Sequence, residues 1–425
     1  MTTTDINPEP AETPETPSDA GAPEVAAAAA MADEPIADDD EDRRKRRLLL
    51  LLLLLLLLCL CCIGTLFARY LMNKQPVTEL IPTQIVSCYP PAYKFSIDGV
   101  DGPVAVAVSP DNQRVYVAEG SGDRLVKMFD RNGNLILTFA PPGTDSANRE
   151  PKYMAVGPNG RVYLVDRTSS AIDIYDPDGK FIDAIVGQNM TLTKYLEKEL
   201  GALPNGTVIT HYEGINKIIT YKLPDSQEEK SIKVIFPDDE PPWNPLGLRF
   251  DDAGNLIYTD TTETEHSVHV IPAAALGNLT EFNPQIASFG SQGNEKDQFS
   301  FPQSVSKDGK GNYFISDGNN ARVDVWTPDM KYKTFFGFGS SVNGALNLPR
   351  GTWMTRGGCL LVADAVGSLI RVYNVAGAEP ALAFEIGGYG IDPGQFNYPV
   401  DVIVDGTGRL YVADRGNNRI QVWSY

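Results

Sequence analysis

The C-terminal stretch Tyr398–Tyr425, which reads YPVDVIVDGTGRLYVADRGNNRIQVWSY, decides the fold. It contains three short runs of β-forming residues, Val400–Val404, Leu410–Ala413 and Ile420–Trp423, separated by clusters of Gly, Asn and Asp. Such runs with turn residues between them are typical of antiparallel strands joined by tight turns. We therefore expect a meander of three strands at this end of the chain.

The same pattern occurs twice more upstream. Residues Pro302–Trp326 read PQSVSKDGKGNYFISDGNNARVDVW, and residues Pro349–Tyr373 read PRGTWMTRGGCLLVADAVGSLIRVY. A unit of short strands that recurs about every 40–50 residues is typical of the blades of a β-propeller. The repeats therefore predict an all-β propeller.

The repeated unit resembles the NHL repeat. In the last copy, the residues that carry the resemblance are Asp405-Gly406, the run Tyr411–Asp414 and the run Asn418–Trp423. The resemblance extends from Tyr93 to the end of the chain and implies a propeller of the NHL type. It implies no single activity, because one fold hosts many functions and propellers of this type include both binding modules and enzymes.

The number of blades follows from the spacing of the expected first strands. The second interval between these strands is about twice the others, and the block Pro158–Val165 is echoed at Pro204–His211. We therefore favour seven blades, with a hidden blade within Gly187–Asn244. Six blades plus an insertion is the alternative, because Thr191–Leu200 has a helical pattern. First strands are expected to begin near Val104, Lys152, Leu246, Gln303, Arg350 and Val400.

The last expected blade is one strand short. The chain ends at Tyr425, directly after its third strand, whereas Tyr93–Ile97 is a strand without a blade of its own. We expect Tyr93–Ile97 to pair with Ile420–Tyr425 and to close a propeller that spans residues 91–425. A closed ring leaves few free strand edges.

Residues 1–47 are predicted to form a disordered tail. The first 42 residues contain 13 acidic and no basic residues and few large apolar side chains, and residues 43–47 read RRKRR. A segment of this composition buries too little apolar surface to offset the entropy that ordering would cost.

Residues 48–68 are predicted to form one transmembrane helix. The run Leu48–Phe67 contains 20 uncharged residues, which as a helix span about 30 Å, the thickness of a bilayer core. Five basic residues precede the run, and only Arg69 and Lys74 follow it closely. The positive-inside rule then places the tail in the cytoplasm and the propeller outside a cell membrane that the chain crosses once. Residues 69–90 are expected to be a linker.

The charge of the exported part constrains its partners. Without the 13 acidic and five basic residues of the first 47, the chain keeps 42 acidic and 31 basic residues, a net charge of −11. Nucleic-acid binding requires a basic surface, so we expect no nucleic-acid partner. We expect contact with the membrane through the one helix and, outside it, a protein or an extracellular polymer.

The five cysteines fall into two groups. Cys59, Cys61 and Cys62 lie within the apolar run, where we interpret them as small residues that lipid tolerates. Cys88 and Cys359 would lie in an oxidising compartment. Whether they pair stays open, because the sequence does not give the distance between them.

Acidic residues end the second strand of each assigned blade. At such a corner, we expect their side chains to accept hydrogen bonds from backbone N–H groups of the following turn. We expect Arg124, Arg322 and Arg419, just before third strands, to be their neighbours. A ring of carboxylates that holds a divalent cation in the channel is the alternative. The acidic residues are Glu119, Asp166, Asp260, Asp317, Asp364 and Asp414.

The three histidines, His211, His266 and His269, are the candidates for zinc ligands. A catalytic zinc site needs three protein ligands and an open position, and strand alternation would direct His266 and His269 apart. The chain also has no nucleophile elbow, HExxH motif or phosphate-binding loop. The sequence therefore assigns no catalytic, cofactor-binding or metal-binding residue and predicts no cofactor.

These observations predict a binding or scaffolding module rather than an enzyme. The resemblance leaves one alternative, a metal-dependent hydrolase or lyase of the lactonase or peptide-amidation type. Partner contacts are expected where the chain departs most from the repeat, within Gly187–Asn244, with Thr191–Leu200 as the main segment. The long connection Phe289–Phe301 is the second expected region.

Overall fold

The computed structural model describes residues 39–73, 88–141, 144–195, 209–213, 216–222, 229–234, 243–262, 265–279, 281–339 and 343–424. The chain divides into two compact units, Met1–Ala68 and Arg69–Tyr425. Most of the predicted N-terminal tail, residues 1–38, lies outside the described residues. So does most of the predicted linker, residues 74–87.

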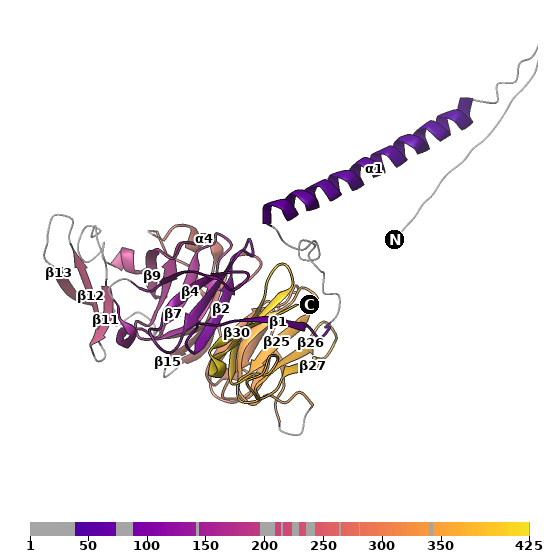
Figure 1. Cartoon of the computed structure of the whole chain (residues 1–425). Coiled ribbons are helices and arrows are strands. Elements are labelled where there is room, and N and C mark those ends of the chain that lie inside the picture. The colour runs from indigo at the N-terminus through magenta and orange to yellow at the C-terminus, as the bar shows by residue number, and fades with distance from the viewer. Residues whose placement is uncertain are drawn as a thin grey trace, which may run out of the picture. The chain divides into compact units, whose positions relative to one another are not determined.

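The first unit contains helix α1 (Asp39–Asn73), which is 35 residues long and continues for a few residues beyond the unit (Figure 1). Its segment Arg43–Thr65 is long and apolar enough to cross a membrane, and its leucines are exposed. The helix is longer than predicted at both ends. It includes Asp39–Arg47, assigned to the tail, and Ala68–Asn73, assigned mainly to the linker. Arg, Lys, Glu and Leu are all good helix formers, so a helix nucleated in the leucine run extends into its polar flanks.

The second unit is built from six antiparallel sheets that correspond to propeller blades (Figure 1). Blade 1 contains β2 (Pro103–Val108), β3 (Arg114–Glu119), β4 (Val126–Asp130) and β5 (Leu135–Phe139). Blade 2 contains β6 (Pro151–Val156), β7 (Val162–Asp166), β8 (Ala171–Tyr175), β9 (Phe181–Gly187) and the short β10 (Met190–Thr191). Blade 3 contains β14 (Pro245–Phe250), β15 (Leu256–Thr262), β16 (Glu265–Ile271) and β17 (Ala287–Phe289).

The remaining three blades follow the same meander. Blade 4 contains β20 (Pro302–Lys307), β21 (Tyr313–Asp317), β22 (Arg322–Trp326) and β23 (Tyr332–Phe336). Blade 5 contains β24 (Pro349–Met354), β25 (Cys359–Asp364), β26 (Leu369–Asn374) and β27 (Ala381–Gly387). Blade 6 contains β28 (Pro399–Val404), β29 (Arg409–Asp414), β30 (Arg419–Ser424) and, from the other end of the propeller, β1 (Ala92–Ile97).

The first strands of the blades form the inner ring. Neighbouring blades contact each other in the order β2, β6, β14, β20, β24 and β28, and β28 contacts β2 again. Every residue of β28 is buried, because an inner strand is covered on both faces. Burial alternates along the outer strand β27, as expected where one face of a sheet meets solvent.

The described residues form six blades, which is the alternative arrangement rather than the favoured seven. Strand β6 contacts β14 directly in the ring. The stretch between them in sequence contains a separate three-stranded sheet of β11 (Ile209–Glu213), β12 (Asn216–Lys222) and β13 (Glu229–Val234). Its strands pair as two hairpins. Most of the sequence echo at Pro204–His211 lies outside the described residues, which resume at Ile209.

Strand β1 completes blade 6. It pairs antiparallel with β30, in a register that runs from Ala92 opposite Ser424 to Ile97 opposite Ile420. Ile97 is buried in an apolar cluster that includes residues of blades 1 and 6. The two ends of the propeller are thus hydrogen-bonded in one sheet.

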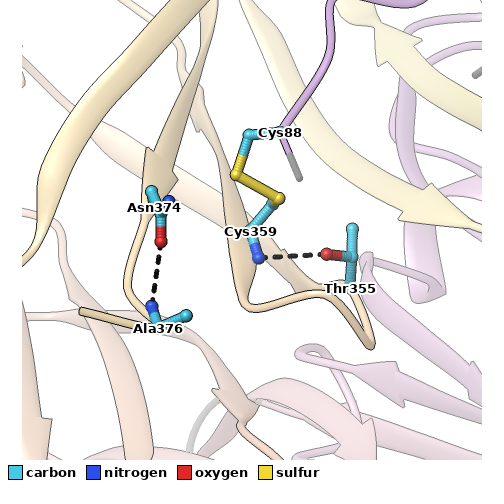
Figure 2. The surroundings of a disulfide bond; sticks show 5 residues. All are labelled: Cys88, Thr355, Cys359, Asn374 and Ala376. Carbon is cyan, nitrogen blue, oxygen red and sulfur yellow. Dashed lines mark hydrogen bonds between the residues drawn. A yellow bond between two sulfur atoms is a disulfide. The ribbon is translucent and has the colours of Figure 1, made fainter. Parts of the chain in front are cut away.

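A disulfide joins Cys88 to Cys359, which resolves the pairing that the sequence left open (Figure 2). The two Cα atoms are 5.6 Å apart, and the residues are 271 positions apart in the chain. Cys88 lies directly ahead of β1, and Cys359 begins β25 in blade 5. The disulfide therefore fastens the start of the ring-closing strand to the neighbouring blade.

Replacing both Cys88 and Cys359 by serine is expected to lower the free energy of unfolding by about 2–5 kcal/mol, because the bond restrains a very long loop in the unfolded chain. Denaturant unfolding of the full chain in detergent measures the change. The matched control is Cys62→Ser, which alters an exposed cysteine of α1. Equal stability of the double variant and the control would contradict the prediction.

Candidate functional site

The acidic residues at the ends of the second strands are acceptors for backbone N–H groups, as predicted. Asp166 accepts from Glu150 at 3.0 Å, Asp317 from Ser300 at 2.6 Å and Asp414 from Asn397 at 2.7 Å. These donors precede the first strand of the same blade. The same holds for Glu119, Asp260 and Asp364, which accept from Asp101, Asn244 and Asn347. The predicted donors in the following turn are present at three of the acids, because Asp166 accepts from Thr168, Asp260 from Thr262 and Asp364 from Gly367.

Arginines pair with these acids in blades 4, 5 and 6. Arg322 lies 3.2 Å from Asp317, and Arg419 lies 2.8 Å from Asp414, as predicted. The prediction for Arg124 was wrong, because its guanidinium donates to the backbone oxygens of Ser146 and Arg149. In blade 1, Lys127 instead pairs with Glu119 at 2.6 Å. In blade 5, Arg371 pairs with Asp364 at 3.2 Å.

The histidines of β16 do not converge on one point. His269 Nε2 lies 2.7 Å from the hydroxyl of Ser267, and its ring stacks on Tyr258. His266 Nδ1 accepts from the backbone N–H of Phe301 at 3.3 Å. The side chain of His211 lies outside the described residues. Within the part of the chain that the structure describes, no group of three His, Cys, Asp or Glu side chains is arranged to hold a metal ion.

Burial lowers the pKa of His269 to about 4, so the folded protein keeps this ring neutral. The unfolded chain binds a proton below about pH 6.5, and stability from this residue is therefore lost as the pH falls from about 6.5 to about 4. The loss amounts to about 3 kcal/mol. Burial raises the pKa of Asp260 to about 6 and that of Asp324 to about 8. These two carboxyls therefore add stability to the folded protein as the pH falls, which is opposite to the effect of His269.

Comparison of the wild type with His269→Phe isolates the histidine from those carboxyls. The phenyl ring keeps the stack on Tyr258 and does not titrate. Between pH 6.5 and pH 4 the wild type is expected to lose about 3 kcal/mol of unfolding free energy relative to the variant. If the difference in unfolding free energy between the wild type and His269→Phe stays constant with pH, the prediction is contradicted.

A buried ion pair crosses the channel. Arg249 on β14 pairs with Asp401 on β28, and both side chains are buried. These strands belong to blades 3 and 6, which lie opposite each other in the ring. The guanidinium also donates to the backbone oxygens of Met154 and Thr352, on blades 2 and 5. One side chain therefore joins four inner strands.

Asp401 is held by groups on several sides. Its carboxylate accepts from the backbone N–H of Val106 at 3.0 Å and of Val402 at 2.9 Å. Gly351 packs so close that a Cβ there would lie 2.3 Å from an oxygen of Asp401, so only glycine fits. Burial raises the pKa of Asp401, while Arg249 and the two N–H groups oppose this rise.

A cavity of about 280 Å³ lies where the first strands begin. We call it the cationic mouth, because three of its lining residues are basic. Arg350 donates to the side-chain oxygen of Gln303 at 2.6 Å and to the hydroxyl of Tyr398 at 3.2 Å. Lys152 pairs with Glu150 at 2.6 Å. The residues that line the mouth are Lys152, Arg167, Leu246, Phe301, Gln303, Asn319 and Arg350.

The opposite end of the inner strands is hollowed as well. Cavities of about 260 and 300 Å³ share Asp252, Trp353 and Met354 in their linings. Their charges are mixed: Lys307 pairs with Asp251 at 3.1 Å in the first, whereas Arg356 and Asp405 line the second. The cationic lining is therefore a property of one end of the channel.

The loops that enter the first strands lie at the end of the inner strands where the cationic mouth is found. In the connection before β20, Ser291, Gln292 and the run 294–297 are exposed. In the connection before β28, the side chains of Tyr389 and Ile391 are 79% and 76% exposed.

The other predicted contact segment, Thr191–Leu200, is largely buried where the structure describes it. Thr191, Leu192 and Tyr195 are buried, and residues 196–200 lie outside the described residues. The expectation of a contact surface at 191–195 was therefore wrong for these three side chains. Leu192 and Tyr195 pack against blade 2, in a cluster with Ala184 and Val186.

Residues 396–423 match the NHL repeat. They form β28, β29 and β30 of a six-bladed ring. The chain is a β-propeller with an NHL repeat. No curated protein matches its sequence.

Solved structures similar to this NHL-repeat propeller include a streptogramin B lyase, at 14% identity and a TM-score of 0.47, over 79% of this chain and 98% of the other. A catalytically inactive virginiamycin B lyase from Staphylococcus aureus with quinupristin is similar at 12% identity and a TM-score of 0.47. The similarity again covers 79% of this chain and 98% of the other. A gluconolactonase from Xanthomonas campestris is similar at 14% identity and 0.48, over 80% of this chain and 95% of the other.

Proposed function

We propose that this chain is a membrane-anchored, extracytoplasmic binding module. Helix α1 holds it in the cell membrane with the N terminus in the cytoplasm, and the propeller binds a protein or an extracellular polymer on the outside. No nucleic acid is expected as a partner, since the propeller is acidic.

The observation that carries the proposal is the disulfide between Cys88 and Cys359. Disulfides persist in oxidising compartments and are rare in the cytosol. The RRKRR cluster ahead of the apolar run supports the same orientation. The disulfide also restrains the ring, and loops on a rigid scaffold are where such domains bind their partners.

The surface that best supports partner contact is the loop face, defined as the exposed parts of the connections 290–300 and 388–397. Tyr389 and Ile391 present large apolar side chains to solvent, and exposed apolar side chains grouped on one surface mark interaction sites. The connection 290–300 adds exposed Glu295, Lys296 and Asp297. Protein-binding surfaces combine an apolar centre with a polar rim.

Surface cross-linking on intact cells, followed by purification of the full chain, tests this proposal. Tyr389→Ser with Ile391→Ser is expected to abolish recovery of the cross-linked partner without lowering the melting temperature. The matched control is Leu135→Ser with Ile136→Ser, which alters two exposed apolar side chains of the outer strand β5. Undiminished recovery with the loop-face variant would refute the assignment of this surface.

The alternative, a metal-dependent hydrolase or lyase, is distinguished by activity. The purified chain is offered simple lactones and esters with and without added divalent metal. Turnover that stops on chelation would replace the binding-module proposal with the enzyme.

A further inference from the structure

We infer that the cationic mouth is a binding site for a small oxyanion, a carboxylate or a phosphate monoester. The inference rests on the proposed function, because it names a ligand chemistry for the end of the propeller at which the loop face lies. It concerns the mouth formed by Lys152, Arg167, Gln303 and Arg350, with Leu246 and Phe301 as its apolar part.

The charges of the mouth are only partly neutralised by the protein. Lys152 has Glu150 as a partner. The guanidinium of Arg350 bonds to two neutral groups, Gln303 and Tyr398. For the guanidinium of Arg167, no ion pair or hydrogen bond is found among the described residues. Two guanidinium groups without a carboxylate partner therefore face one cavity.

This arrangement differs from that of three arginines of the propeller that pair with a carboxylate, although Arg124 also bonds only to neutral groups. Arg249 pairs with Asp401, Arg322 with Asp317 and Arg419 with Asp414. A cavity lined by one sign of charge raises the local concentration of ligands of the opposite sign. An anion supplied from solution would complete the charge pairing that these other arginines obtain from the chain itself.

The chemistry of the lining selects an oxyanion. The planar guanidinium group matches the geometry of carboxylate and phosphate oxygens and binds them through paired N–H groups. The amides of Gln303 and Asn319 offer hydrogen bonds to the rest of the ligand, and Leu246 and Phe301 offer apolar contact. At about 280 Å³, the cavity is at the small end of ligand sites, so it suits a single small unit.

Titration calorimetry of the full chain in detergent tests the inference with three small probes. N-acetylalanine carries a carboxylate, methyl phosphate carries a phosphate monoester, and N-acetylalaninamide is the neutral counterpart of the first. We expect at least one anion to bind and to weaken as salt is raised, whereas the amide does not bind. The anion that binds distinguishes the carboxylate from the phosphate ligand.

Arg167→Gln is expected to weaken anion binding at least tenfold and, because its guanidinium has no described partner, to leave the melting temperature unchanged. The matched control is Arg356→Gln, an exposed arginine of the opposite end, which is expected to bind as the wild type does. A second variant, Arg350→Gln, is expected to weaken binding as well, with its folding checked by melting.

Two results with the probes and the variant would overturn the inference, and a third would come from the wild type alone. One is equal binding of the amide and the anions, and the other is unchanged anion binding in Arg167→Gln. A wild-type chain that captures its macromolecular partner but binds neither anion also overturns it, and leaves the proposed function standing. Undiminished partner recovery with the loop-face variant concerns the proposed function instead, so the two failures are distinguishable.

Discussion

Asp401→Ala is expected to lower the free energy of unfolding by about 3–5 kcal/mol, because it leaves the buried charge of Arg249 without its counterion. The guanidinium is almost completely buried, and its remaining acceptors are backbone oxygens at 3.3–3.5 Å. These long hydrogen bonds do not replace a carboxylate. The variant also frees the N–H of Val106, which now donates to Asp401.

Denaturant unfolding measures the loss of stability in Asp401→Ala. A double variant separates the effect of lost charge pairing from that of lost packing. Arg249→Met combined with Asp401→Leu removes both charges and keeps apolar volume in the channel. It is expected to be more stable than Asp401→Ala, since replacing a whole buried pair costs less than breaking it. Stability of Asp401→Ala within about 1 kcal/mol of the wild type would show that the ion pair does not hold the ring.

Removal of β1, residues 92–97, is expected to destabilise the propeller by a similar amount. The deletion leaves the edge of β30 unpaired and removes Ile97, which is buried, and Phe95, which is partly buried. Each apolar side chain of this size contributes about 1.5–3 kcal/mol when fully buried. The loss should appear in the unfolding of the whole propeller, because β1 carries the closing contact of the ring.

Point substitutions test the same claim without changing the chain length. Phe95→Ala with Ile97→Ala is expected to lower stability by about 3–5 kcal/mol, the range of large-to-small changes in a core. The matched control, Leu135→Ala with Ile136→Ala, truncates two exposed side chains of β5. Similar melting temperatures for the two double variants would contradict a role of β1 in closing the ring.

The strands were predictable from the sequence because each blade is formed by strands that are close to one another in the chain. Turn residues such as Gly406 and Gly408 fix the hairpins within a few positions, and the repeat makes each copy a check on the others. The blade number depended on whether β6 meets β14. That contact joins residues about 90 positions apart, and nothing in the local pattern of β11–β13 records whether a hairpin lies in the ring.

The site was predictable to a smaller extent, for a related reason. The backbone-accepting role of Asp317 or Asp414 follows from its place at a strand end. The pair of Arg249 with Asp401 joins opposite blades, and its only sequence signal is one charged residue inside each of the apolar strands PLGLRF and PVDVIV. The cationic mouth draws its lining from blades 2, 3, 4 and 5, so its charge emerges only when the ring closes.

The most direct test of the central claim, a propeller exported by one membrane anchor, is protease treatment of intact cells. The chain carries one epitope tag ahead of Met1 and a second after Tyr425. Added protease is expected to remove the C-terminal tag and to leave the N-terminal tag on a fragment that retains α1. Disruption of the membrane should then expose the N-terminal tag as well. Protection of the C-terminal tag in intact cells, with digestion only after disruption, would contradict the account.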